Sequence, residues 1–497
     1  MGVVLRQTVR GSIYTYIGAA LGFITVAVVQ PKVITQEQIG LLSLLNDLSL
    51  VFAAFAALGF SSTVRYFPYF RNAERKHHGY LFLACAVALI GFLLMCLVIF
   101  LFKDQIISQK SQESFLFADY YYYLIPLTFF FLYFNVFELF ARVNYEVVIS
   151  QLLREVVKRI FILIAFSLLF FNVIGFSGFM PIWLLASVLP TVILLWHISR
   201  MKSFSFSSNL GFLRQNKDLV RKLVNISGFT LLIATAPHII GLIDKYMLNQ
   251  IYGLSVAGVY TITMYFGSFI SMPIRSLHSI SLPIVAEAWK EDDRETIRSL
   301  YYKSCINQLI LAVLLFVGIW ANVDNIFIYL PDFESGKYVI FFIGLMSAVD
   351  MGTGINGTII ATSKYYRYDG LFHLLLVILT IITNLIFIPL YGITGAAMAT
   401  ALTRILFNLF RYFFVWRVFK MQPFDWRNLA TILLGVAAYF IAMLIPQLSN
   451  FIIDIAVRSV VITGLFLPAV YFFKVSGEYN HLVEKYLRKA RGMFKRK

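Results

Sequence analysis

The chain has 497 residues, of which 60% are hydrophobic and only 13% are charged, and its formal net charge is +17 at pH 7. This composition excludes an ordinary soluble protein, in which about a quarter of the residues are charged. Apolar runs recur along the whole chain, and each run of about 20 residues is long enough to cross about 30 Å of hydrocarbon. Such runs must be helical, because a helix satisfies its own backbone hydrogen bonds inside the bilayer. The sequence therefore predicts an all-α polytopic membrane protein.

Hydropathy predicts about fourteen transmembrane helices. In the first half of the chain they are expected near residues 9–29, 38–60, 79–102, 118–141, 156–172 and 178–199. In the second half they are expected near residues 222–244, 254–276, 304–323, 339–362, 368–388, 393–416, 428–446 and 452–473.

The basic residues divide unevenly between the two sides of the membrane. With the N-terminus inside, roughly 34 of the Lys and Arg residues lie in inner segments, about 5 in outer segments and about 3 within spans, which is the bias of the positive-inside rule. Lys245 is among those assigned to the outer segments. The distribution predicts that both termini are cytoplasmic. It also attributes the positive charge to a membrane surface and gives no reason to expect a nucleic-acid partner.

Two glycine landmarks recur at an offset of about 217 or 218 residues, which indicates a duplicated unit. Gly40 follows the polar break in PKVITQEQIG, and Gly258 follows a similar break in NQIYGLSVAG. Gly178 and Gly395 end the runs GFSG and GITG. Because each unit has an even number of spans, the second enters the membrane in the same orientation as the first. The expected architecture is therefore two parallel six-helix repeats followed by two C-terminal helices.

A polar segment near residue 210 separates the repeats and sets the expected domain boundaries. They are an N-terminal six-helix lobe (1–201), an inter-lobe cytoplasmic linker (202–218), a C-terminal six-helix lobe (219–421), two additional transmembrane helices (422–473) and a basic cytoplasmic tail (474–497). The tail sequence EYNHLVEKYLRKARGMFKRK predicts a basic amphipathic helix that lies on anionic lipid.

Charged residues inside the spans are the most informative ones for function. A central Arg or Asp costs about 2.5–3.5 kcal/mol on insertion scales, so each needs a partner or a wet cavity. Arg404 and Asp350 lie near mid-span in the second repeat, and Asp47 does so in the first. No acidic residue lies within four positions of Arg404, and Asp350 is its expected partner. Two pairs spaced by four residues can instead form ion pairs within one helix; they are Glu138 with Arg142 and Asp454 with Arg458.

The signatures of common catalytic and cofactor sites are missing from the sequence. It has no GxxxxGK(S/T) loop for nucleotide phosphates, no HExxH and no paired CxxC. Cys85, Cys96 and Cys305 fall within or beside apolar spans, with neither the spacing nor the setting of a disulfide frame or a metal site. We therefore expect no enzymatic activity, no cofactor and no metal.

The run IDKYMLNQIYGLSVAGVY, followed by SLPIVAEAWKEDD, resembles the middle of the oligosaccharide flippases, the Wzx-like polysaccharide transporters. NLIFIPLYGITGAAMATALTR is similar to their eleventh-to-twelfth-helix signature. These flippases belong to the multidrug/oligosaccharidyl-lipid/polysaccharide (MOP) superfamily. The resemblance implies two six-helix lobes around a cavity with alternating access, in the bacterial inner membrane. It also implies an undecaprenyl-diphosphate-linked oligosaccharide as the cargo, with polysaccharide-assembly proteins as further partners.

One departure narrows the expected cargo. The related lipid II flippases carry an arginine within an Ala-Asp-Arg run at the start of their eighth helix. Here Tyr260-Thr261-Ile262-Thr263 stands in that region, without the arginine. The difference favours a glycan other than the peptidoglycan precursor.

A diphosphate that crosses the membrane needs cationic groups inside the cavity, and the planar fork of arginine matches phosphate. The candidates for this contact are Arg404 and Arg275. The candidates for sugar contacts are Asn46, Asn384, Tyr265 and Tyr391. The candidates for coupling transport to an ion or a proton are Asp47, Asp244 and Asp350.

Two other functions compete with this prediction. A drug/cation antiporter of the same superfamily would share the two lobes but normally stops at twelve helices. A membrane-embedded glycan polymerase or ligase would carry its acids, bases and arginines on a long outer loop, whereas the outer segments here are short and poor in charge.

Overall fold

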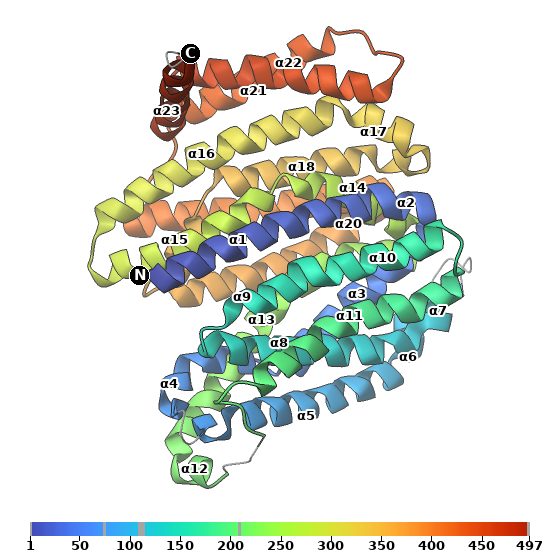
Figure 1. Ribbon diagram of the computed structural model, residues 1–497, viewed down its shortest axis with the longest axis vertical. Coiled ribbons are helices and arrows are strands. Elements are labelled where there is room, and N and C mark those ends of the chain that lie inside the picture. The colour runs from blue at the N-terminus through green and yellow to red at the C-terminus, as the bar shows by residue number, and fades with distance from the viewer. Residues whose placement is uncertain (1, 73–75, 108–114, 207–209, 495–497) are drawn as a thin grey trace. The chain divides into compact units, whose positions relative to one another are not determined.

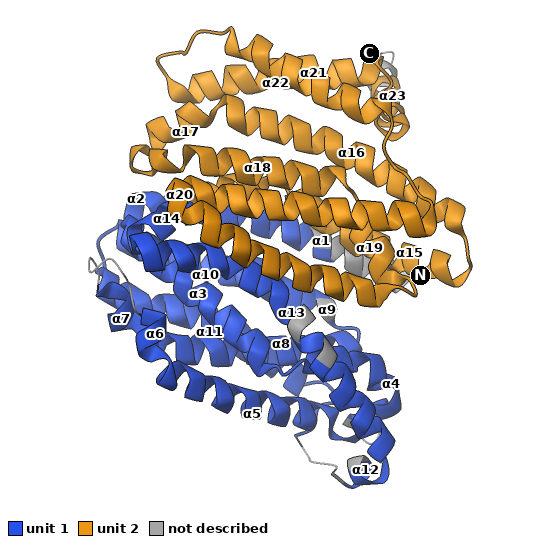
Figure 2. Cartoon of the chain, turned by 180° about the vertical axis from the view of Figure 1, so that it is seen from behind, with its two compact units in different colours: residues 1–261 blue, residues 262–497 orange. Residues whose placement is uncertain are grey.

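The computed structural model describes residues 2–72, 76–107, 115–206 and 210–494 (Figure 1). Across these residues every regular element is a helix. The predicted all-α class is therefore confirmed. The chain divides into two compact units, residues 1–261 and 262–497, which Figure 2 shows in blue and orange.

Unit 1 is built from long helices joined by short turns. In chain order the main ones are α1 (Gly2–Phe23), continued through a π-helix (Ile24–Val29) into α2 (Gln30–Val33), then α3 (Gln36–Ala56), α5 (Tyr80–Leu101), α8 (Leu124–Val143), α9 (Val147–Leu152) with a π-helix (Leu153–Val157) into α10 (Lys158–Phe170), α11 (Phe176–Ser199) and α13 (Lys217–Tyr252). α14 (Leu254–Phe269) begins in unit 1 and ends in unit 2. Short helices include α4 (Phe67–Phe70), α6 (Lys103–Ile107), α7 (Leu116–Tyr120) and α12 (Leu210–Gln215).

Unit 2 continues with α15 (Met272–Lys290), α16 (Arg294–Ala321), α17 (Val323–Tyr329), α18 (Lys337–Gly352), α19 (Asn356–Thr362), α20 (Tyr366–Phe414) with a π-helix (Val415–Phe419), α21 (Trp426–Met443), α22 (Phe451–Phe472) and α23 (Gly477–Phe494). The added helices α21 and α22 pack on α16 through a buried apolar cluster that includes Ile310, Ala438 and Phe466.

Within the described residues, nine helices are long and apolar enough to cross a membrane. Two further pairs of helices are bent at a short break, and the number of candidate spans rises to eleven if each pair forms one span. One of the nine, Tyr366–Phe419, has 54 residues, a length of about 80 Å that far exceeds the hydrocarbon thickness. Its backbone breaks at Gly392 (φ 57°, ψ −132°), and the hydroxyls of Thr383 and Thr403 lie 2.9 Å apart across the break. α20 is therefore a hairpin of two helices.

The predicted fifth and seventh spans are not among these helices. They correspond to α10 and α13, and α13 carries Pro237, His238, Asp244 and Lys245 in its interior. The polytopic membrane fold is confirmed, whereas the number fourteen stays a prediction.

The glycines that define the repeat occupy matching helix positions. Gly40 is the fifth residue of α3, which begins at Gln36, and Gly258 is the fifth residue of α14, which begins at Leu254. Gly178 is the third residue of α11, and Gly395 is the third residue after the break at Gly392. The order of the helices agrees with two parallel repeats.

The compact units do not coincide with the lobes expected from the repeats. The division lies at residue 261, not within 202–218, because α13 packs on the first repeat. A Cβ added to Gly59 would lie 2.0 Å from the carbonyl oxygen of Ser227, and Thr230 Oγ1 donates to Ser62 Oγ at 2.8 Å. The boundaries 1–201, 219–421 and 422–473 stay predictions about the repeats.

Candidate functional site

Arg404 lies on the second half of α20 and forms an ion pair with Asp350 of α18. Its Nε donates to Asp350 Oδ2 at 3.1 Å. The arginine side chain is 35% exposed and the aspartate side chain 17%. The partner expected for Arg404 is therefore the partner observed. Because each charge offsets the other, both can be placed in an apolar bundle at an acceptable cost.

Two further side chains fix the aspartate. Asn408 donates through Nδ2 to Asp350 Oδ1, and Thr353 donates through Oγ1 to Asn408 Oδ1 at 3.1 Å. Both carboxylate oxygens of Asp350 therefore accept a hydrogen bond from a side chain. In the described part of the chain the Nη1 and Nη2 atoms of Arg404 have no hydrogen-bond partner. These two nitrogens can donate to an anionic ligand while Nε stays on Asp350.

A second arginine, Arg411, lies two helical turns from the first. Its Nη2 donates to Asp369 Oδ1 at 2.6 Å, and the side chain of His373 is bonded to the Asp369 backbone oxygen at 2.8 Å. The Phe407 ring lies below both guanidinium groups, with its centroid 5.7 Å from Arg404 Cζ and 4.1 Å from Arg411 Cζ. Such cation–π contacts help to hold cations in an apolar setting.

The spacing of Arg404, Asn408 and Arg411 places all three on one face of the helix. This set of three polar residues was not predicted, although its i, i+4, i+7 spacing is visible in the sequence. The need for a glycine at position 357 was not predicted either. A Cβ added there would lie 2.7 Å from Arg411 Nη1, so the glycine of α19 leaves room for the guanidinium. On the neighbouring α15, His278 Nδ1 is 3.0 Å from Thr358 Oγ1.

The other candidates in unit 2 do not gather around Arg404. Arg275 is exposed on α15 and forms no hydrogen bond or ion pair with the described residues. Tyr391 is 57% exposed beside the break in α20, where its ring contacts Phe387. Asn384 is fully buried in the first half of α20. Tyr265 lies half-buried on α14, and its hydroxyl has no partner in the described part of the chain.

Unit 1 contains a separate ion pair between two helices. Lys245 Nζ of α13 lies 2.7 Å from Asp47 Oδ2 and 2.9 Å from Ser43 Oγ on α3. Asn46 donates to Asp47 Oδ1 at 3.0 Å. Asp244, the residue before the lysine, is buried and accepts from the Tyr260 hydroxyl at 2.7 Å.

The assignment of Lys245 to an outer segment stays a prediction. The residue lies inside the long helix α13, seven positions before its end at Tyr252. The predicted span ends at residue 244, where Asp244 and Lys245 interrupt the apolar run. Asp47 is therefore not a free carboxylate, and it would have to leave Lys245 before binding an ion or a proton.

Two further charged pairs lie away from the Arg404 network. Arg458 and Asp454 are 7% and 1% exposed and are 2.7 Å apart. The same aspartate accepts from Asn325 and from the backbone of Leu448. Glu138 pairs with Arg142 of its own helix at 3.8 Å and also with Arg154. The expected helix pairs are present, and each has an additional partner from elsewhere in the chain.

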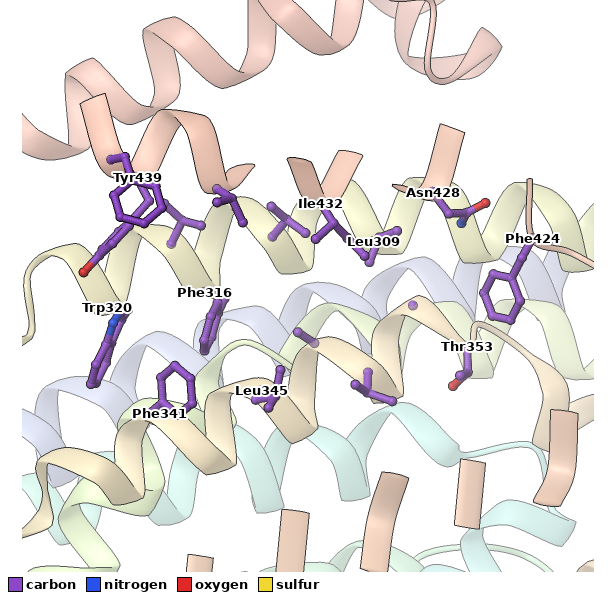
Figure 3. A pocket seen from close by; sticks show the side chains of 17 residues that line it. Leu309, Phe316, Trp320, Phe341, Leu345, Thr353, Phe424, Asn428, Ile432 and Tyr439 are labelled. Atoms are coloured by element: carbon purple, nitrogen blue, oxygen red, sulfur yellow. The ribbon is translucent and has the colours of Figure 1, made fainter. Parts of the chain in front are cut away.

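An apolar groove begins beside the Arg404 network. It has a volume of about 580 Å³ and lies between α16, α18 and α21. Figure 3 shows Thr353, Asn428 and Phe424 at one end and Trp320, Phe341 and Tyr439 at the other. Thr353 is shared, because its hydroxyl donates to Asn408 of the charged cluster. In the described part of unit 2, the Arg404–Asp350 pair therefore lies next to an apolar groove.

No group of His, Cys, Asp or Glu side chains in the described residues has the arrangement of a metal site.

The sequence of this chain is distantly similar to that of a known membrane protein. No protein-family model matches the chain. An uncharacterised membrane protein of Methanocaldococcus jannaschii is 21% identical over 276 residues, and the match covers 53% of each chain. The chain thus spans about half the length of this curated relative.

Solved structures of transporters match between 81% and 95% of the chain. The lipid II flippase MurJ in an inward closed conformation has a TM-score of 0.68 at 16% identity, covering 95% of this chain and 99% of that one. An inward-facing multidrug resistance MATE family transporter of the MOP superfamily has a TM-score of 0.59 at 14% identity, with coverage of 81% and 93%. The MATE transporter VcmN of Vibrio cholerae has a TM-score of 0.55 at 11% identity, with coverage of 84% and 97%. The chain therefore has the fold of MOP transporters, as its sequence indicated.

Proposed function

We propose that this chain, which has the fold shared by MurJ and the MATE transporters, moves an undecaprenyl-diphosphate-linked oligosaccharide across the bacterial inner membrane by alternating access. The observation that carries this proposal is the continuity between the Arg404 cluster and the apolar groove. An amphiphile with an anionic head and a long hydrocarbon chain matches both parts at once. The diphosphate binds Arg404, and part of the polyprenyl chain lies in the groove.

The exchange of partners at Arg404 gives the site a way to respond to cargo. A diphosphate near Arg404 competes with Asp350 for the guanidinium, because both are anionic acceptors. Asp350 then loses its countercharge inside the membrane, where an unpaired carboxylate is costly. Uptake of a proton or a cation would restore neutrality. We therefore place ion or proton coupling at Asp350, and assign Asp47 the same type of exchange with Lys245.

A drug/cation antiporter is the second candidate, because MATE transporters share the fold. An organic cation needs a carboxylate that is free to pair with it. Asp350 and Asp47 are both paired with basic side chains, whereas the terminal nitrogens of Arg404 are open. The paired carboxylates and the open arginine nitrogens together favour an anionic cargo over a cationic one. The fold also favours transport over the polymerase or ligase alternative.

Complementation of a flippase-deficient strain tests the proposal. Arg404→Ala should abolish complementation while the protein still reaches the membrane, as checked by blotting. Arg404→Lys should restore activity only partly, since it keeps the charge but loses the planar fork. Arg294→Ala is the matched control, because that arginine pairs with Asp292 on the exposed surface, and it should be milder. Full activity of Arg404→Ala would remove this residue from the site.

Filling the groove tests the second half of the proposal. Ala348 of α18 lines the groove, whereas Leu311 of α16 is exposed outside it. Ala348→Phe should lower transport of a fluorescent lipid-linked oligosaccharide in proteoliposomes, and Leu311→Phe should not. Transport of a cationic dye, with no transport of the lipid-linked glycan, would instead support the antiporter.

A further inference from the structure

The last helix, α23, turns across the end of the membrane helix before it. α22 ends at Phe472 and α23 begins at Gly477. Figures 1 and 2 both show α23 running crosswise to α21 and α22. A helix that crosses the end of a membrane span runs along the bilayer surface. The four residues between them keep it at the depth where that span leaves the hydrocarbon.

Four contacts hold the first turn of α23 in this direction. Ser476 Oγ donates to Asn307 Oδ1 of α16 at 2.6 Å, and Glu478 pairs with Lys303 of α16 at 2.9 Å. Tyr479 and Asn480 donate to backbone oxygens of α22, those of Leu467 and Tyr471. Burial alone would raise the pKa of Glu478, but the hydrogen bond from Lys303 and the helix backbone lower it below its usual value. The carboxylate is therefore charged at neutral pH, and the turn is fixed.

Beyond this turn the helix exposes an apolar stripe that has no partner in the described chain. Leu482 is 52% exposed, Tyr486 64% and Leu487 47%. At 100° per residue these three side chains fall within one arc of about 140° together with Tyr479 and Val483. A globular helix with water on all sides would not gain from such a stripe, which marks an interaction surface.

Basic residues occupy the opposite arc and its border. Lys485, Arg488 and Lys489 are all exposed. Glu484 is the one acidic side chain between residues 481 and 489, and it lies 3.5 Å from Arg488. The surface therefore combines an apolar stripe with net positive charge. This combination is typical of helices that lie in a membrane interface and bind anionic lipid.

We propose that α23 is an anionic-phospholipid binding site, seated in the interface of the same bilayer that α22 crosses. The apolar stripe enters the boundary between headgroups and acyl chains, and Lys485, Arg488 and Lys489 bind lipid phosphates. The proposal does not depend on the cargo of the transporter. α23 is bonded to α16, which also lines the apolar groove.

Spin labels on the full-length protein test the placement. In a background with Cys85, Cys96 and Cys305 replaced by alanine, labels are attached to Leu482→Cys and Tyr486→Cys on the apolar arc, and to His481→Cys and Glu484→Cys on the polar arc. The protein is reconstituted in nanodiscs of phosphatidylcholine with or without phosphatidylglycerol. With phosphatidylglycerol, labels at 482 and 486 should become severalfold more accessible to oxygen than to a water-soluble nickel chelate, and labels at 481 and 484 should show the opposite order.

A charge-matched pair of variants tests the headgroup contacts. The triple variant Lys485→Gln, Arg488→Gln, Lys489→Gln should lose the effect of phosphatidylglycerol. The control variant Lys217→Gln, Arg221→Gln, Lys222→Gln removes the same charge from exposed positions at the start of α13 and should keep it. Water-accessible labels at 482 and 486 in both lipids would overturn the proposal. Equal burial in both lipids would overturn the assignment to anionic lipid, and burial only after a cell extract is added would indicate a protein partner instead.

Discussion

At the scale of single residues, the charged pairs of unit 2 differ in how many donor nitrogens of the arginine remain without a partner in the described residues. The guanidinium of Arg458 donates hydrogen bonds to Asp454, to the backbone oxygen of Ile445 and to the sulfur of Met443. Within the described residues, Arg404 donates a hydrogen bond to another side chain only through Nε. The first arrangement is closed and stabilises the turn between α21 and α22. The second is open and suits a ligand, so substitutions in the two pairs should have different consequences.

The Asp454 pair predicts a loss of stability. Asp454→Ala leaves Arg458 buried without a countercharge and removes the acceptor of Asn325 and of the Leu448 backbone. Breaking one partner of a buried pair costs about 3–5 kcal/mol. Thermal unfolding in detergent should therefore shift strongly downward. Arg294→Ala breaks the exposed pair with Asp292 and should change the free energy of unfolding by less than about 1 kcal/mol. Equal melting temperatures for the two variants would contradict this reading.

At the scale of helices, close approach of backbones decides which positions must be glycine. A Cβ added to Gly40 would lie 2.1 Å from the carbonyl oxygen of Leu254, and one added to Gly258 would lie 1.9 Å from that of Gln36. α3 and α14 thus touch through their backbones, as small residues allow in membrane helices. The two landmarks of the repeat lie against each other at this crossing.

The crossing predicts a contrast between two glycine-to-alanine variants. Gly258→Ala forces α3 and α14 apart, and overpacking of this kind costs about 1–3 kcal/mol. Gly241 of α13 has no atom within 4 Å of an added Cβ, so Gly241→Ala should be neutral or stabilising by up to about 1 kcal/mol. Thermal unfolding of the two variants measures the difference. A Gly258→Ala protein as stable as the wild type would show that the helices separate easily.

Helix-scale features also show what the sequence could predict and what it could not. Period and length of the apolar runs predicted the helical class, and the glycine offsets predicted matching helix positions. The Arg404–Asp350 pair followed from the absence of a nearer acid. The pairing of Lys245 with Asp47 was not predicted, because a hydropathy window cannot see a carboxylate on another helix. The same reason explains why the sequence did not point to Arg411, Asp369 and Gly357. Their roles depend on contacts between segments that are distant in the chain.

At the scale of the whole molecule, the remaining question is which side of the membrane each connection faces. Between the last turns of the helix that ends at Phe419 and the first turn of α21, the chain carries Arg417, Lys420 and Arg427, whereas residues 444–450 between α21 and α22 contain no basic residue. The excess of Lys and Arg on cytoplasmic connections sets orientation. The first connection is therefore expected in the cytoplasm, the second outside, and α23 again in the cytoplasm.

Cysteine accessibility tests this orientation with two exposed positions. Ser449 lies in the connection between α21 and α22, and Asn216 lies in the break before α13. In the background without native cysteines, Ser449→Cys should react with a membrane-impermeant maleimide in spheroplasts, because an odd number of spans separates it from the cytoplasmic tail. Asn216→Cys should react only after the membrane is permeabilised, because six spans, an even number, bring the chain back to the side of the N-terminus. Labelling of both positions from outside would mean that α10 or α13 does not cross the membrane, and the parallel orientation of the repeats would then be wrong.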